Sequence, residues 1–234
     1  MTYICLYVMV YYILNINNNI IMILSFLNQK GGVGKTTLSI NVATCLALKK
    51  TKVLLIDADP QNSSLDWVAT RKKESLFTVV GLTKPIIHKE VAKLVKNYDH
   101  IIIDGPPRIY DVAKSAIVTS DLVVMPVQPS PYDIWAANEV VSLIKEVSQP
   151  LEGIKNIKAS FLINRKITNT AIGRDVEQAL DHYDMDILQT HICQRVAYAE
   201  TAAIGSTVME EHNRDNLAVK EITDLTNEIL EKYN

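Results

Sequence analysis

The sequence predicts an α/β fold in which a mostly parallel, twisted sheet carries helices on both of its faces. Three observations predict it. Short runs that are apolar throughout are typical of strands buried on both faces of a parallel sheet. Amphipathic stretches of helical length separate these runs, as in repeated βα units. The length of 234 residues, 48% of them hydrophobic, fits a single domain with a full core.

Seven segments are expected to form the strands of this sheet. Each is a mainly apolar run bounded by polar residues, glycine or proline. In chain order they are 23–28, 52–59, 77–81, 100–105, 121–127, 157–165 and 185–192. Amphipathic helices are expected between them, for example over 36–50 and 85–98, and a terminal helix over 216–233.

The first 20 residues do not fit this alternation. Residues 3–14 form an apolar run, 15–19 are rich in asparagine, and no charged side chain precedes Lys30. The run is shorter than the roughly 20 residues that span a bilayer, and it lacks the basic start and cleavage site of a signal peptide. We expect residues 1–20 to be a leader outside the fold and 21–234 to be the domain, with Met22 as the natural start. A membrane-tethering leader is the alternative.

Composition excludes several functional classes. The formal net charge is -2, which argues against a surface coated with nucleic acid but leaves a local basic patch open. Three widely spaced cysteines, Cys5, Cys45 and Cys193, support neither a disulfide framework nor a zinc knuckle. The sequence is therefore interpreted as that of a cytoplasmic protein.

A glycine-rich segment, KGGVGKTT over 30–37, follows the first expected strand and opens the first expected helix. Its glycines let backbone N–H groups turn toward phosphate oxygens, and the helix N-terminus favours the same anion. A P-loop NTPase fold is therefore expected, with Lys35 against the β- and γ-phosphates and the Thr36 hydroxyl on Mg²⁺. The predicted nucleotide-binding residues of the loop are Gly31, Gly32, Val33, Gly34, Lys35, Thr36 and Thr37.

Four segments carry a family resemblance. NQKGGVGKTT (28–37) resembles the deviant Walker A motif of the ParA/MinD superfamily of P-loop ATPases, and HIIIDGPP (100–107) resembles its Walker B motif. VLLIDADPQNSS (53–64) and VVMPVQPSPYDIWAANEVV (123–141) are similar to further segments of this superfamily. The likeness runs from Met22 to near the C-terminus and is greatest to short ParA proteins of the ParF type.

Three aspartates are candidates for the metal site and for hydrolysis. Asp57 and Asp59 end one expected strand and Asp104 ends another, so all three belong to the sheet edge where such folds bind ligands. Asp104 would reach Mg²⁺ through water. The resemblance implies that Asp59 orients the attacking water and that Asp57 belongs to the metal shell. A capping role for Asp57 in the following helix is the alternative.

The resemblance also implies roles for three residues elsewhere. Lys30 is the signature lysine, which in relatives crosses a dimer to the partner's nucleotide, so Lys30, Lys35 and Asp59 are the expected catalytic residues. Asn164 offers an amide donor and acceptor that suit adenine, although a turn-capping asparagine is the alternative. Arg195 is the expected site of sequence-independent DNA contact.

The resemblance implies a weak, partner-stimulated Mg-ATP hydrolase for plasmid or chromosome partition. ATP would close a homodimer that binds nucleoid DNA without sequence preference, and a ParB-like centromere-binding protein would trigger hydrolysis. The nearest alternative is a MinD-like membrane switch, which needs a basic amphipathic C-terminal helix. Residues 220–232 instead carry Lys220 and Lys232 against Glu221, Asp224, Glu228 and Glu231, so no membrane partner is expected unless the leader is real.

Overall fold

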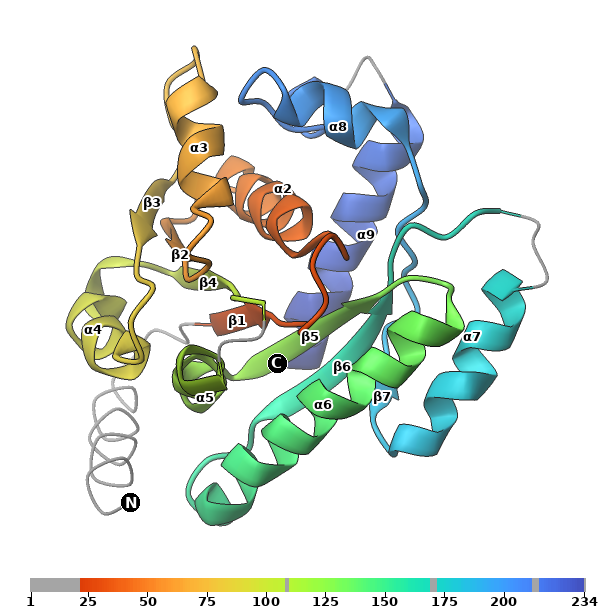
Figure 1. Ribbon diagram of the computed structural model, residues 1–234. Coiled ribbons are helices and arrows are strands. Elements are labelled where there is room, and N and C mark those ends of the chain that lie inside the picture. The colour runs from red at the N-terminus through yellow and green to blue at the C-terminus, as the bar shows by residue number, and fades with distance from the viewer. Residues whose placement is uncertain (1–21, 108–109, 169–171, 212–214, 234) are drawn as a thin grey trace.

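The computed structural model describes residues 22–107, 110–168, 172–211 and 215–233 (Figure 1). These residues form one sheet with helices on both sides. The predicted leader over 1–20 lies outside the described residues, so the boundary at residue 21 stays a prediction.

The sheet has seven strands in the order β3-β2-β4-β1-β5-β6-β7, and every pairing between them is parallel. The strands are β1 (Met22–Phe26), β2 (Val53–Asp57), β3 (Thr78–Gly81), β4 (His100–Asp104), β5 (Leu122–Val127), β6 (Lys158–Ile163) and β7 (Asp186–Ile187). Each lies within or beside its predicted segment. The predicted α/β fold with a parallel sheet is confirmed.

β7 is shorter than the segment 185–192 that the sequence predicts. The backbone N–H groups of Gln189 and Thr190 donate to the two carboxylate oxygens of Glu228, at 2.6 and 2.8 Å. Because these N–H groups bond to a side chain of the terminal helix, they do not extend the strand ladder.

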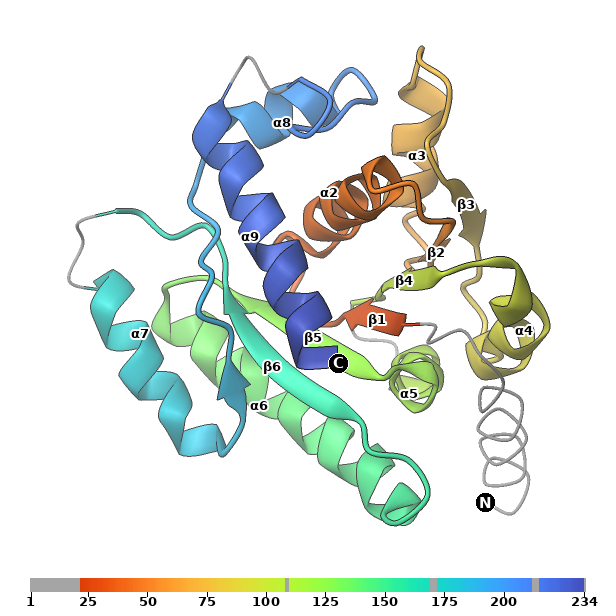
Figure 2. The same ribbon diagram turned by 180° about the vertical axis from the view of Figure 1, so that it is seen from behind.

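Helices cover both faces of the sheet (Figures 1 and 2). One face carries α2 (Lys35–Leu48), α3 (Ser63–Thr70), α8 (Val196–Ala202) and α9 (Asn216–Tyr233). The other carries α4 (Ile87–Leu94), α5 (Tyr110–Thr119), α6 (Pro131–Ser148) and α7 (Ile172–Leu180).

Alternate residues of the central strands contribute to two separate cores. In β1, Ile23 packs into the core under α4, α5 and α6, whereas Leu24 packs into the core under α2 and α9. Both side chains are fully buried. A parallel sheet buried on both faces has only its strand ends available for ligands, and β1, β2 and β4 end at neighbouring positions of one edge.

Candidate functional site

The loop between β1 and α2 is held open as a cradle by two glycines. Gly32 and Gly34 have φ values of 75° and 97°, in the left-handed region that favours glycine. Gly34 is also the N-cap of α2, so the helix begins directly at the loop. A Cβ atom on Gly34 would lie 2.3 Å from Nδ2 of Asn164. The predicted strand–loop–helix arrangement is present, and its geometry suits a bound phosphate.

Lys35 is the first residue of α2, directly after this loop. Its side chain is buried, and Nζ donates a long hydrogen bond, of 3.3 Å, to the carbonyl oxygen of Lys30. Burial lowers the pKa of Lys35, while the carboxylates of Asp104 and Asp59 oppose that effect. Asp59 itself is half-buried, and its Oδ1 accepts from the N–H of Gln61 at 2.9 Å. The structure thus brings a buried cation near two of the predicted carboxylates.

Asp57 and Asp104 lie side by side, since they are register partners on the adjacent strands β2 and β4. Both are fully buried. The oxygens of Asp57 accept from backbone: Oδ2 from Ser64 and Leu65, at 2.9 and 3.1 Å, and Oδ1 from Asp59, at 3.2 Å. Asp57 therefore caps the start of α3, as in the alternative raised from sequence, and its metal role stays a prediction.

Asp104 is bonded differently. Oδ2 accepts from the Ser64 hydroxyl at 2.9 Å, but Oδ1 is buried with no hydrogen-bond partner among the described residues. Burial raises the pKa of Asp104 to about 7, with the Thr36 hydroxyl and the Lys35 ammonium acting in the opposite direction. A spare carboxylate oxygen beside a threonine hydroxyl is a donor set that suits Mg²⁺. The residues present therefore fit the expected ion.

Lys30 makes a contact that the sequence analysis did not foresee. Its Nζ lies 2.5 Å from Oδ2 of Asp133, in the first turn of α6. The Asp133 side chain is 1% exposed, while that of Lys30 is 40% exposed. The two residues are 103 positions apart, and the segment over 123–141 contains Asp133 without marking it as a site residue. In this structure the signature lysine is held within its own subunit.

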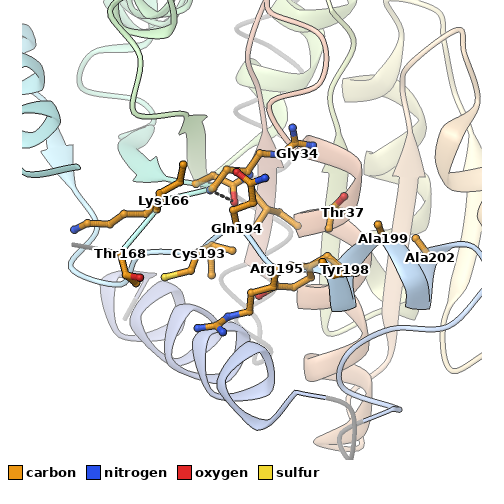
Figure 3. Close-up of a pocket in the computed structure, with 16 residues that line it drawn as sticks. Gly34, Thr37, Lys166, Thr168, Cys193, Gln194, Arg195, Tyr198, Ala199 and Ala202 are labelled. Carbon is orange, nitrogen blue, oxygen red and sulfur yellow. Dashed lines mark hydrogen bonds between the residues drawn. The ribbon is translucent and has the colours of Figure 1, made fainter. Parts of the chain in front are cut away.

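A cavity of about 760 Å³ opens beside the P-loop (Figure 3). That volume falls in the range of small-molecule sites. Its walls come from the start of α2, from the chain after β6 and from the segment that leads into α8. The lining includes Gly34, Thr37, Asn164, Lys166, Gln194 and Arg195. Gly34 belongs both to the cavity wall and to the glycine-rich loop.

Asn164 lies at the junction of loop and cavity. Its Nδ2 donates to the carbonyl oxygen of Val33 at 2.6 Å, and its Oδ1 accepts from the N–H of Arg165 at 2.9 Å. Asn164 thus braces the P-loop and caps its own turn, as expected of a turn-capping asparagine. Its contact with adenine stays a prediction.

Arg195 is one of the residues that line the cavity, and its side chain extends toward α9 (Figure 3). Its guanidinium donates to both carboxylate oxygens of Glu221, at 2.6 to 3.1 Å, and reaches Asp215 at 3.4 Å. These carboxylates hold the pKa of Arg195 above its usual range. DNA contact by Arg195 stays a prediction, and phosphate would have to compete with two carboxylates for this side chain.

None of the helices in the described parts of the chain combines the length and apolar character needed to cross a membrane. This finding covers the amphipathic helix α9.

Comparison with known proteins identifies the family. The model of the CobQ/CobB/MinD/ParA nucleotide binding domain matches residues 24–208. The "Maintenance of carboxysome distribution protein A" of Halothiobacillus neapolitanus is 29% identical over 213 residues, which cover 88% of this chain and 95% of that protein. The "Sporulation initiation inhibitor protein Soj" of Bacillus subtilis is 27% identical over 228 residues, which cover 80% of this chain and 90% of that protein.

Solved structures share the fold. Apo McdA of Cyanothece has a TM-score of 0.75 at 16% identity, covering 90% of this chain and 99% of that one. The MinD cell division protein of Aquifex aeolicus has a TM-score of 0.70 at 22% identity, covering 89% of this chain and 96% of that one. Since the family model spans most of its length, the chain belongs to the CobQ/CobB/MinD/ParA nucleotide-binding family and is an ATPase of the ParA/MinD type.

Proposed function

We propose that this chain is a Mg-ATP-dependent partition ATPase. ATP binding drives homodimerisation and sequence-independent DNA binding, and a ParB-like centromere-binding partner triggers hydrolysis during plasmid or chromosome segregation. The proposal is supported mainly by two buried charged residues, Lys35 and Asp104, next to a glycine-rich loop in a chain of this family. Relatives named as a chromosome-partitioning ATPase of Thermus thermophilus and a virulence plasmid ParA family protein of Chlamydia psittaci support the class.

The chemistry follows from the positions of the side chains. Backbone N–H groups of the loop bind the phosphates, and Lys35 neutralises the β- and γ-phosphate charge. Thr36 and Asp104 hold Mg²⁺, which supplies further charge neutralisation when it is bound. Asp59, half-buried beside Lys35, orients the attacking water. The nucleoside occupies the cavity beside Asn164.

Lys30 acts in trans in this proposal. In the monomer its amino group is bound to Asp133, so this ion pair must open before Lys30 can reach a partner's γ-phosphate. A second cation at the transferring phosphoryl group stabilises the transition state, which is how dimerisation would enable hydrolysis. ATP binding, dimerisation and hydrolysis are thereby coupled.

DNA binding is proposed through phosphate contacts of the ATP-bound dimer, with Arg195 and its surroundings as the candidate surface. The net charge of -2 restricts such binding to a local patch. The expected location is the cytoplasm, in association with the nucleoid.

A MinD-like membrane-associated positioning ATPase is the alternative, and the surface of α9 weighs against it. Lys220 pairs with Asp224 at 3.0 Å and Lys232 with Asp186 at 2.9 Å. Because its two lysines are already neutralised by carboxylates, α9 offers little attraction to anionic lipid. The carboxysome relative favours a second candidate, in which the same cycle positions a protein body instead of a plasmid or chromosome.

The test is DNA binding measured by fluorescence anisotropy with ATP, with ADP and without nucleotide. We expect binding with ATP alone, falling steeply as salt increases and equal for unrelated sequences. Lys35→Ala is the matched control and should not respond to ATP. A nucleotide-independent footprint at one sequence would indicate an operator-binding protein. Sedimentation with anionic vesicles in place of DNA would indicate the membrane alternative.

A further inference from the structure

A buried serine connects the two aspartates that end β2 and β4. Ser64 is the second residue of α3 and is fully buried. Its N–H donates to Oδ2 of Asp57 and its hydroxyl donates to Oδ2 of Asp104, each at 2.9 Å. One residue therefore supplies a hydrogen bond to each of two neighbouring buried carboxylates.

The hydrogen bonds from the N–H and from the hydroxyl of Ser64 have different roles. The backbone N–H belongs to the cap of α3, where Leu65 contributes a second N–H to the same oxygen. That cap needs no side chain at position 64. The hydroxyl instead fixes Asp104, which is the carboxylate that retains an unbonded oxygen, Oδ1, within the described structure. A carboxylate held by one oxygen presents the other in a defined direction.

We propose that Ser64 is a positioning residue of the metal site, acting through Asp104. Its hydroxyl holds Oδ2 and so keeps Oδ1 available to the Mg²⁺ shell. This inference rests on the proposed Mg-ATP function and adds a role for Ser64, which ends the family-like segment over 53–64 but received no role from the sequence. Loss of such an outer hydrogen bond typically weakens metal binding by about 10- to 100-fold.

The test separates metal binding from nucleotide binding. The affinity of the full chain for fluorescent N-methylanthraniloyl-ADP is measured in EDTA, and MgCl₂ is then titrated to find the concentration of half-maximal effect. In Ser64→Ala we expect the EDTA affinity to stay within about twofold of the wild type. The MgCl₂ concentration of half-maximal effect should be about tenfold higher, or more, than that of the wild type.

Ser39→Ala is the matched control. Ser39 is also fully buried, in α2, and its hydroxyl has no hydrogen-bond partner among the described residues. Its Mg²⁺ titration should match that of the wild type. If Ser64→Ala fails to fold, Ser64→Cys, with a weak donor in the same place, gives the answer: an increased Mg²⁺ requirement supports the proposal and an unchanged one overturns it.

Asp104→Asn tests the metal role of Asp104 separately from the positioning role of Ser64. If it leaves the Mg²⁺ requirement unchanged, the metal role of Asp104 in the proposed function is wrong, and the role of Ser64 is wrong with it. If Asp104→Asn raises the requirement but folded Ser64→Ala stays within twofold of the wild type, only the inference about Ser64 is overturned.

Discussion

Removing Lys30 should destabilise the nucleotide-free protein as well as impair its function. Lys30→Ala leaves the Asp133 carboxylate, 1% exposed, without the cation that lies 2.5 Å away. Its Oδ1 already has no hydrogen-bond partner in the described structure. Breaking a fully buried ion pair costs about 3–5 kcal/mol. Lys30 is 40% exposed, so water screens the pair, and the α6 N-terminus favours the remaining charge. We therefore expect a loss of about 2 kcal/mol.

The assay is urea unfolding of the nucleotide-free protein in a double-mutant cycle. Lys30→Ala and Asp133→Asn are measured singly and together. Because both single variants break the same contact, the double variant should lose less free energy of unfolding than the sum of the two, by at least about 1 kcal/mol. The slope of the unfolding free energy against urea should stay constant.

Additive losses would refute the reasoning, as would a Lys30→Ala variant as stable as the wild type. The cycle also isolates the proposed role in trans. The double variant regains stability because no unpaired charge remains, but it still lacks the lysine. ATP-dependent dimerisation, measured by size-exclusion chromatography with ATP and Mg²⁺, should therefore remain impaired in it.

Three other predictions concern nucleotide binding, turnover and pH. Lys35→Ala should abolish ATP binding measured by calorimetry, because the phosphates lose the cation buried in their loop; unchanged affinity would exclude the P-loop role. Asp59→Ala should bind ATP but hydrolyse it about 10²-fold more slowly and accumulate as an ATP-bound dimer on DNA; elution as an ATP-bound monomer would contradict its water-orienting role. Asp104, with a pKa raised to about 7, binds a proton in the folded state that an unfolded chain releases near pH 4. The free energy of unfolding without nucleotide should therefore decrease as pH rises from about 4 to 7. Asp104→Asn should lack this component in urea melts at several pH values.

The sheet was predictable because its strands are buried on both faces. A strand such as HIIID has apolar residues at successive positions, and this pattern does not depend on distant partners. The end of β7 was not predictable for the opposite reason. The N–H groups of Gln189 and Thr190, just after β7, bond to Glu228, 39 and 38 residues away, and a contact of this kind leaves no periodic pattern in the sequence.

The candidate site likewise has parts that the local sequence predicts and parts that depend on distant contacts. The glycine loop is predictable because its conformation is determined locally, by residues that tolerate positive φ. The Lys30–Asp133 pair forms only when the sheet brings the ends of β1 and β5 together. Asn164 braces the loop across 131 positions, through the same convergence of strand ends. Such contacts follow from topology and not from local sequence.

Asp57 and Asp104 show how a local difference separates two similar carboxylates. Each ends an apolar strand, so the strands alone do not distinguish them. The chain after Asp57 turns into α3, whose first N–H groups lie over its carboxylate. The chain after Asp104 reads Gly105-Pro106-Pro107, in which the prolines have no N–H to donate and the glycine N–H bonds to Phe26. Backbone N–H groups therefore hydrogen-bond to the carboxylate of Asp57 but not to that of Asp104. For this reason we propose that Asp104 binds Mg²⁺ and that Ser64 positions its carboxylate.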